Sequence, residues 1–328
     1  MLEPLLSAVS SHYGLSIVKH EILHKTNRTL VVSLDTTQEC YVLKSIYVEE
    51  ERLRFILDAE NYLRQRGMAI PITFPTLNKE PYLRWEENRY VLQEKIQGIP
   101  QSLSSPDAIA SKASLIGMMH AASLGFHSSF GPDYAEEYYW EMLYDRKIKA
   151  ISKWKERFSK TRSAKKRNIL KMIDYYLVTG TSLKQQLQMD PQFQAWRKQP
   201  VEQHFIAHGD FHSENVLHTR DRIYIIDWEF VRYDFPSKDI ARILNSISKH
   251  YEPWNATVFQ NLLNCYRQFN PLNDWQMQMV FLDLSFPHAF YRFLQNRAYK
   301  NMSLEEVNMF LQREHDKTSY LLHLLKNA

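Results

Sequence analysis

Acidic and amide side chains flank two short apolar runs in the second half of the sequence. Asp210 and Asn215 precede the run at 216–218, and Asp227 follows the run at 223–226. The polar turn between the runs predicts a hairpin, which would bring Asp227 back to Asn215. Carboxylate and amide oxygens suit Mg²⁺, and a further carboxylate nearby could take a proton from a hydroxyl group. On its own, the pattern is equally typical of a polar hairpin with capped turns.

Two charged residues in the first hundred lie among apolar neighbours. Strand alternation places Lys44 on one face with Val42 and Ile46, and helical spacing places Glu60 within an apolar stripe. Burying either charge without a partner would be costly. We therefore predict a Lys44–Glu60 ion pair that holds the lysine toward an anionic ligand. The alternative is that Lys44 reaches solvent at a sheet edge and that Glu60 lies at the margin of the stripe.

The elements that must position these residues begin with a β-rich region. Short β-branched and aromatic runs separated by polar turns indicate an antiparallel three-stranded meander, and regularly spaced leucines before Gly67 indicate a helix. Two further strands precede a boundary at Gly98 and Pro100. The expected elements are strands at 18–23, 30–34, 40–47, 82–85 and 89–95 and a helix at 49–66.

Helical periodicity dominates the remainder of the chain, apart from the short apolar runs between 204 and 230. The fold class is therefore α+β, with a small antiparallel β lobe containing one helix and a large, mainly helical lobe. The expected helices lie at 107–125, 135–160, 164–189, 238–250, 255–269, 274–298 and 303–326.

Composition narrows the class of protein. The chain has 328 residues, of which 44% are hydrophobic, so it can form packed cores and is not a disordered chain. An acidic N-terminal segment and the lack of a long apolar stretch favour a soluble protein with neither an export signal nor a membrane span. The two cysteines, Cys40 and Cys265, are far apart, which fits a reducing compartment better than a zinc site or a disulfide scaffold.

Basic residues are concentrated at 146–171. This segment holds twelve Lys or Arg and one Glu, a charge of +11, which leaves −7 for the rest of a chain whose net charge is +4. We interpret it as a solvated helical face that could meet an anionic partner. Nucleic-acid binding is less favoured, because Trp154 and Phe158 are its main aromatic residues.

The polar segments resemble those of a known family. His208-Gly-Asp210 with Asn215, followed by Ile-Asp227-Trp-Glu229, is similar to the catalytic loop and metal motif of aminoglycoside phosphotransferases and choline kinases, relatives of the protein kinases. The resemblance covers about residues 15 to 300. It implies a bilobal protein-kinase-like fold with a nucleotide-binding lobe at 1–98 and a catalytic and substrate lobe at 99–328, and it implies ATP and Mg²⁺ as cofactors.

The resemblance gives the matching positions their roles in phosphoryl transfer. Asp210 would orient the acceptor hydroxyl and take its proton, while Asn215 and Asp227 would hold Mg²⁺. Lys44 would contact the nucleotide phosphates, and Glu60 corresponds to its partner on the helix.

Other matching positions would bind adenine or support the loop. Glu94 and Ile96 belong to a segment that looks like the strand and linker that hold adenine. His208 and Asp239 are expected to be scaffolding, with Asp239 anchoring the catalytic loop through its backbone amides. His212, Glu214 and Glu229 could line the acceptor site or make local hydrogen bonds. Asp283, His288, Tyr291 and Arg292 are further candidates for contacting the acceptor.

The sequence departs from the family pattern in two places. The turn from His24 to Thr29 contains no glycine, so backbone amides would approach phosphates less closely and nucleotide affinity would be weak. Trp228 and Glu229 follow Asp227, so the Asp-Phe-Gly hinge that protein kinases use for switching is absent.

Within that superfamily, the chain looks most like the kinase-like proteins of Bacillus spore coats, the CotS and YsxE group. This resemblance is based on the turn Lys25-Thr26-Asn27-Arg28, the helical segment Asp58-Ala-Glu60, the overall length and the order of the lobes. The function expected is transfer of phosphate from ATP to a hydroxyl of a small molecule, in association with sporulation. The expected location is cytoplasmic, and the resemblance extends it to the mother-cell cytoplasm and the spore coat, where other coat proteins would be further partners. The alternative is a noncatalytic coat protein that retains the fold as a scaffold.

Overall fold

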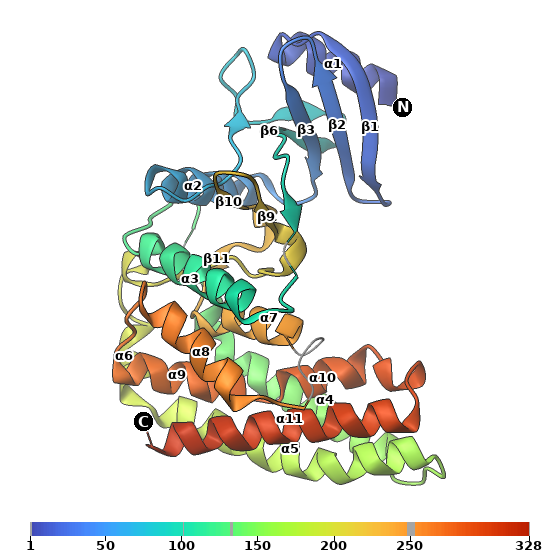
Figure 1. Cartoon of the computed structure of the whole chain (residues 1–328), viewed down its shortest axis with the longest axis vertical. Helices are drawn as coiled ribbons and strands as arrows, with labels where there is room; N and C mark the ends of the chain where they lie inside the picture. Colours follow the sequence, from blue (N-terminus) through green and yellow to red (C-terminus); the bar gives the residue numbers. More distant parts are fainter. Residues whose placement is uncertain (1, 101, 132–133, 248–252, 328) are drawn as a thin grey trace. The chain divides into compact units, whose positions relative to one another are not determined.

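The computed structural model describes residues 2–100, 102–131, 134–247 and 253–327 (Figure 1). The chain divides into two compact units, each described separately below. The first unit contains Met1–Gln101, Phe126–Asp133 and Asp210–Val231, and the second contains Ser102–Gly125, Tyr134–Gly209 and Arg232–Ala328. The sequence placed a boundary after residue 98, whereas here two later segments are grouped with the N-terminal part.

An antiparallel sheet forms the body of the first unit, as the sequence predicts (Figure 1). Its strands follow the order β1-β2-β3-β6-β4, and β5 pairs with β6. The polar turns separate β1, β2 and β3 as expected. The strands are β1 (Ile17–Lys25), β2 (Leu30–Thr36), β3 (Cys40–Ile46), β4 (Thr73–Phe74), β5 (Leu83–Trp85) and β6 (Asn88–Glu94).

Two helices cover apolar side chains of this sheet. The sequence predicts α2 (Glu50–Gln65), whose Leu53 and Leu57 pack with side chains of β3 and β6. It does not predict α1 (Leu2–Tyr13), which buries Leu5 and Val9 against the alternate side chains of the same strands. Because alternate strand residues point to opposite faces, two separate apolar clusters form.

A hairpin that supports the candidate site lies in the first unit. β9 (Val216–His218) and β10 (Ile223–Ile225) pair antiparallel, with Val216 opposite Ile225. The Ile226 amide donates to the Asn215 carbonyl at 3.0 Å, so the predicted register is confirmed. β7 (Ile99–Pro100) pairs with β9. Gly98 is needed beside it, because a Cβ there would lie 2.8 Å from the Cβ of Leu217.

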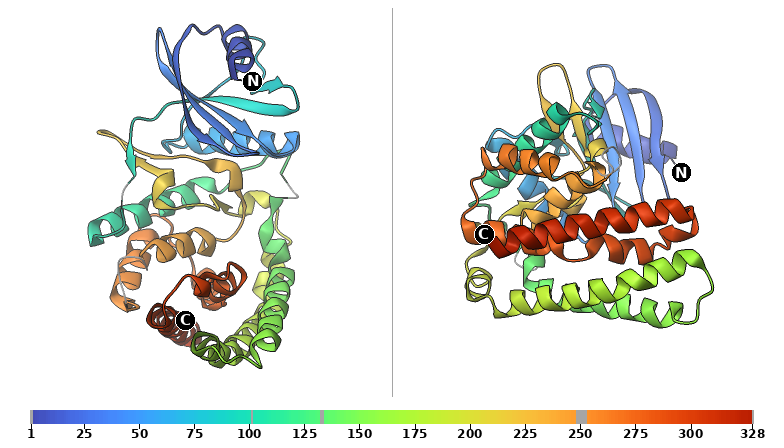
Figure 2. Two further views of the ribbon diagram at one scale, coloured as in Figure 1. Left: turned by 90° about the vertical axis from the view of Figure 1, so that its right-hand side faces the viewer. Right: turned by 60° about the horizontal axis from the view of Figure 1, so that its bottom comes forward.

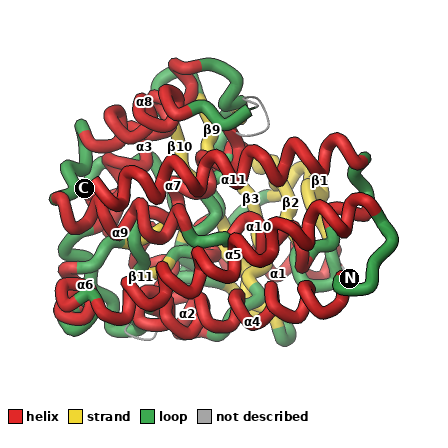
Figure 3. Tube along the Cα trace, turned by 90° about the horizontal axis from the view of Figure 1, so that it is seen from below, coloured by secondary structure: helices red, strands yellow, loops and turns green. Residues whose placement is uncertain are grey.

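Helices make up most of the second unit, as expected. α5 runs beside both α4 and α11 in this unit (Figures 2 and 3). The helices are α3 (Pro106–Ser123), α4 (Trp140–Phe158), α5 (Ala164–Met189), α6 (Pro191–Trp196), α7 (Ser237–Ile247), α8 (Ala256–Arg267), α9 (Asp274–Ser285), α10 (His288–Gln295) and α11 (Leu304–Asn327). A short pair of strands, β8 (Ile206–Ala207) and β11 (Arg232–Tyr233), accompanies them.

Two of the predicted helices differ from those observed. The helix expected at 274–298 is two helices, α9 and α10, because Pro287 cannot continue a regular helical hydrogen-bond ladder. The helix expected from 135 begins at Trp140, after a 3₁₀ turn at Glu136–Tyr139. The last residues of the helix expected at 238–250 lie outside the described residues. Among the described helices, none combines the length and apolarity that crossing a membrane requires.

Candidate active site

A cavity of about 620 Å³ lies within the first unit. Five of the site candidates named from the sequence line it: Lys44, Glu94, Ile96, Asp227 and Glu229. Its apolar walls are supplied by the sheet and by the hairpin segment, with Leu23, Val31, Val42, Leu217, Ile226 and Phe230. A mainly apolar cavity with a few convergent polar groups is typical of a small-molecule site.

Lys44 lies at the polar end of this lining, between two carboxylates. Its Nζ is 2.5 Å from Oδ1 of Asp227 and 2.6 Å from Oε1 of Glu229. Burial lowers the pKa of Lys44, but the two carboxylates more than offset that effect, so its pKa is raised overall. Glu229 was not predicted as a lysine partner, although its place two residues after Asp227 is the signal that marks it.

The predicted Lys44–Glu60 ion pair is wrong. Glu60 is 3% exposed and accepts a hydrogen bond from Thr73 Oγ1 at 3.1 Å. Within the described residues, Glu60 has no cation at ion-pair distance, because Lys44 forms its ion pairs with Asp227 and Glu229. Burial raises the pKa of Glu60 to about 7, and Arg64 and the hydrogen bond from Thr73 only partly oppose this.

The hairpin end has an unusual backbone at Asp227. This residue is left-handed, with φ of 66°, and Asp is one of the few non-glycine residues that adopt this conformation readily. The Trp228 indole fixes the turn by donating to the Ile225 carbonyl at 3.0 Å. Such strained backbones concentrate at functional sites.

Asp210 and Asn215 are joined to the same hairpin but do not line the cavity. The Asn215 side-chain nitrogen donates to the Asp210 carbonyl at 3.0 Å. His212 Nδ1 accepts from the Glu214 amide, so a neutral imidazole carries its proton on Nε2, which lies 3.3 Å from Asp210 Oδ2. His212 therefore accepts a local hydrogen bond and presents its other ring nitrogen to the Asp210 carboxylate.

The scaffolding interpretation of Asp239 is confirmed within the second unit. Its carboxylate accepts from the backbone amides of His208 at 2.8 Å and Gly209 at 2.9 Å, and from His120 Nε2 at 3.1 Å. Complete burial raises the pKa of Asp239, but the hydrogen bond and charge of His120 outweigh it, so the pKa is lowered. Asp239 thus fixes the chain that leads directly into Asp210.

Two backbone amides of the glycine-free turn at 24–29 donate hydrogen bonds within the turn. The backbone amides of Arg28 and Thr29 donate to the Thr26 hydroxyl at 3.1 and 2.9 Å. In a glycine-rich loop such amides point to phosphates. The Thr26 hydroxyl would compete with a phosphate for these two amides, and the weak nucleotide affinity expected from the sequence stays a prediction.

The residues that could hold a metal offer oxygen atoms. The side-chain nitrogen of Asn215 donates to the Asp210 carbonyl, so its side-chain oxygen is the atom that could bind a metal. Asp227 offers a carboxylate. In the described ranges, no group of three or more His, Cys, Asp or Glu gathers as a metal site. This donor set fits Mg²⁺, which usually binds one or two protein oxygens and fills its shell with phosphate and water.

The basic segment falls on α4 and α5. Trp154 and Phe158 are buried in the helical core, at 6% and 2% exposure, so they offer no platform for stacking bases. Lys155 pairs with Asp174 at 2.5 Å. The segment is therefore largely a charged surface over an aromatic core.

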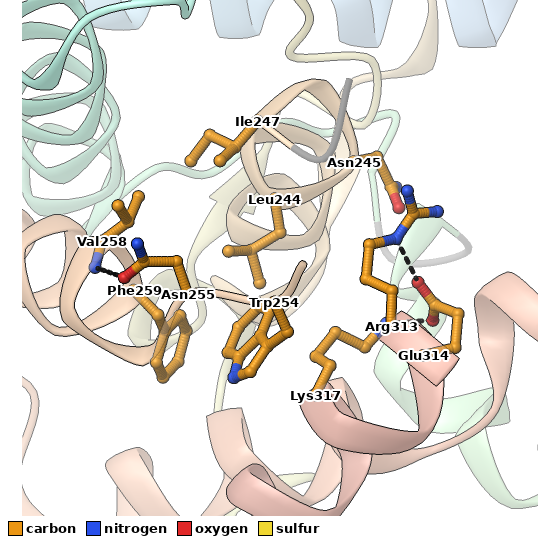
Figure 4. Close-up of a pocket in the computed structure, with 10 residues that line it drawn as sticks. All are labelled: Leu244, Asn245, Ile247, Trp254, Asn255, Val258, Phe259, Arg313, Glu314 and Lys317. Atoms are coloured by element: carbon orange, nitrogen blue, oxygen red, sulfur yellow. Dashed lines mark hydrogen bonds and ion pairs between the residues drawn. The ribbon is translucent and has the colours of Figure 1, made fainter. Parts of the chain in front are cut away.

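A further small cavity lies in the second unit (Figure 4). Its volume is about 30 Å³, and its lining includes Leu244, Trp254 and Phe259 together with Arg313, which pairs with Glu314. A water molecule requires roughly 10 to 15 Å³ on this scale. The cavity can hold water but not a nucleotide or a substrate.

Comparison with known proteins identifies the family of this chain. Residues 23–272 match the phosphotransferase enzyme family, so the chain belongs to this family. A curated relative is spore coat protein S of Bacillus subtilis (strain 168), which is 24% identical over 343 residues, covering 97% of this chain and 93% of the relative.

Solved structures share the whole fold at low identity. An aminoglycoside phosphotransferase from Alicyclobacillus acidocaldarius superimposes with a TM-score of 0.78 at 18% identity, covering 98% of this chain and 95% of that one. An amicoumacin kinase in complex with AMP-PNP and Ca²⁺ gives a TM-score of 0.66 at 16% identity, with coverage of 97% and 93%. The resemblance drawn from the sequence and the kinase-like α+β fold are thereby confirmed.

Proposed function

We propose that this protein is an ATP- and Mg²⁺-dependent phosphotransferase that acts on a hydroxyl group of a small molecule. The observation that carries the proposal is the meeting of Lys44 with Asp227 and Glu229 in a cavity of about 620 Å³. A cation held between carboxylates beside an apolar cavity can exchange those partners for nucleotide phosphates and a metal.

The remaining residues fit defined roles. The apolar walls would hold adenine, and the Ile96 amide, which donates to no acceptor in the described part of the chain, would hydrogen-bond to the base. Asn215 and Asp227 would bind Mg²⁺. When bound, ATP and Mg²⁺ would supply the phosphoryl group and neutralise its charge. Asp210, held by His212, would orient the acceptor hydroxyl and accept its proton.

The named relative supports a proposed association with the spore. Because this chain is similar to spore coat protein S over nearly its whole length, we propose that it acts in sporulation, either in the mother-cell cytoplasm or at the coat. The occupied amides beside Thr26 favour a second candidate, a noncatalytic coat protein that keeps the fold as a scaffold.

The experiment compares wild type with Asp210→Asn. ATP binding is followed by calorimetry, and slow ATP hydrolysis by phosphate release. We expect the substitution to leave binding nearly unchanged and to remove most hydrolysis, because Asp210 acts on the acceptor and not on the nucleotide. Asp221→Asn, which removes an exposed carboxylate in the hairpin turn, is the matched control. Equal loss of binding and hydrolysis would contradict the role, and binding without hydrolysis in wild type would support the scaffold.

A further inference from the structure

A cavity of about 290 Å³ in the second unit has more basic than acidic side chains in its lining. α4, α7 and α10 contribute to its wall. Five of its lining residues are Lys or Arg and two are acidic, Glu136 and Asp283. The basic and imidazole side chains are Lys147, Arg232, Lys238, Arg242, His288 and Arg292.

The two acids in this cavity are already engaged. Asp283 is 1% exposed and accepts from Tyr144 at 2.6 Å, Lys238 at 3.0 Å and His288 at 2.9 Å, as well as from Ser237. Burial raises its pKa, but Lys238 and His288 outweigh burial, so the pKa lies well below its ordinary value. Its oxygens are therefore used within the protein.

The other acid of the lining, Glu136, pairs with Arg232. The Arg232 guanidinium lies 3.5 Å from Glu136 and 2.9 Å from the buried Asp234. The carboxylates of the lining are thus paired with Lys238 and Arg232.

Lys147 and Arg292 retain charges without a carboxylate partner. Within the residues that the structure describes, neither makes an ion pair with an acid. Because His288 donates through Nε2 to Asp283, its Nδ1 accepts from Lys147 Nζ, 2.9 Å away. Burial and Lys147 lower the pKa of His288 to about 3, so the ring stays neutral and keeps this orientation. Burial and Lys238 lower the pKa of Lys147 to about 8.

We propose that this cavity binds an anionic group, a phosphate or carboxylate, of the hydroxyl-bearing acceptor. The acceptor role rests on the proposed function, whereas anion binding does not. Gly209 connects the anion cavity to the proposed acceptor residue. It lines the cavity, where its carbonyl accepts a hydrogen bond from Arg242 at 3.1 Å, and Asp210 is the next residue in the chain. An anion would supply the counter-charge that Lys147 and Arg292 lack, and bonds between charged groups are the stronger kind of hydrogen bond.

The test uses the full chain without nucleotide and four small hydroxyl compounds of different charge. Binding of glycerol 3-phosphate, glycerate, glycerol and choline is measured by calorimetry. We expect the two anions to bind and glycerol and choline not to bind. Binding of choline in preference to the anions, or no binding of either anion at tens of millimolar, would overturn the inference.

Substitutions of Lys147 and Arg292 test whether these side chains contact the bound anion. Lys147→Gln and Arg292→Gln should each weaken glycerol 3-phosphate binding about tenfold or more, since each removes a charge-assisted hydrogen bond. Lys149→Gln, which changes an exposed lysine two residues further along α4, is the control and should bind as wild type does. Because Arg292 is exposed, its variant should fold even if that of Lys147 does not. Unchanged affinity in both variants would overturn the assignment.

The pH profile and the nucleotide assay separate this inference from the proposed function. Affinity for glycerol 3-phosphate should fall as pH rises through about 8, where Lys147 loses its charge, while the arginines remain charged. A flat profile through that range would count against Lys147 as the anion contact. If anions bind but Mg²⁺ and ATP do not, the cavity stands as an anion site and the phosphotransferase proposal fails.

Discussion

Replacing Glu60 by Gln should make the protein less sensitive to pH. Glu60 is buried, and burial raises its pKa from an ordinary value of 4.5 to about 7. The folded state therefore holds this proton more tightly than the unfolded state. Stability contributed by protonated Glu60 is present at low pH and is lost as pH rises from about 4.5 to about 7. Gln keeps the size and the acceptor for Thr73 but cannot ionise.

The size of the effect follows from the shift in pKa. At about 1.4 kcal/mol per unit, the full loss is roughly 3 kcal/mol, of which about 2 to 3 kcal/mol falls between about pH 5 and pH 8. Urea unfolding followed by circular dichroism at several pH values measures the difference between variant and wild type. The variant should gain stability relative to wild type across this range.

A matched control and a clear contrary result accompany this measurement. Glu21→Gln removes an exposed carboxylate on β1, and its difference from wild type should stay nearly constant with pH. If the Glu60→Gln and wild-type stabilities run parallel from about pH 5 to about pH 8, Glu60 does not carry a raised pKa. The account of its burial without a lysine partner would then be wrong.

Three further outcomes are expected. Thr26→Ala should tighten ATP binding several-fold in calorimetry, because it frees two backbone amides; unchanged affinity would show that these amides do not face phosphates. Asp239→Asn should cost about 3 kcal/mol in urea unfolding, because it places an amide group among buried donors; a loss below about 1 kcal/mol would contradict its anchoring role. Lys153→Gln with Lys160→Gln should weaken any association with an anionic surface, less so as salt rises, and should leave the melting temperature unchanged; marked destabilisation would show a structural role.

Local sequence pattern predicts the fold well where periodicity is strong. The meander, α2 and the register of the β9–β10 hairpin follow from alternation and turn residues, and Asp239 meets the amides of His208 and Gly209 as the motif implies. The single helix expected across Pro287 is two helices, because proline interrupts the helical hydrogen bonds even though the apolar pattern continues past it. α1 was missed because its apolar residues gain their role only by packing on the sheet.

The site shows the limits of such reasoning more sharply. Apolar neighbours correctly indicate that Lys44 and Glu60 are enclosed, but enclosure does not specify partners. Three carboxylates compete for one lysine, and chain topology brings Asp227 and Glu229 to it, while Glu60 is satisfied by Thr73. The basic cavity is another case, because Lys147 is indistinguishable in sequence from its solvated neighbours until the helix places it beside His288.

The central claim is tested most directly by calorimetric titration of ATP with and without Mg²⁺ into wild type and Asp227→Asn. We expect wild type to bind ATP and Mg²⁺ to strengthen that binding, whereas Asp227→Asn should lose the Mg²⁺ effect. Asp221→Asn, an exposed carboxylate in the turn of the same hairpin, should behave as wild type does. No binding of ATP to wild type at several millimolar, or an Mg²⁺ effect that survives in Asp227→Asn, would contradict the claim that this cavity is a nucleotide and metal site.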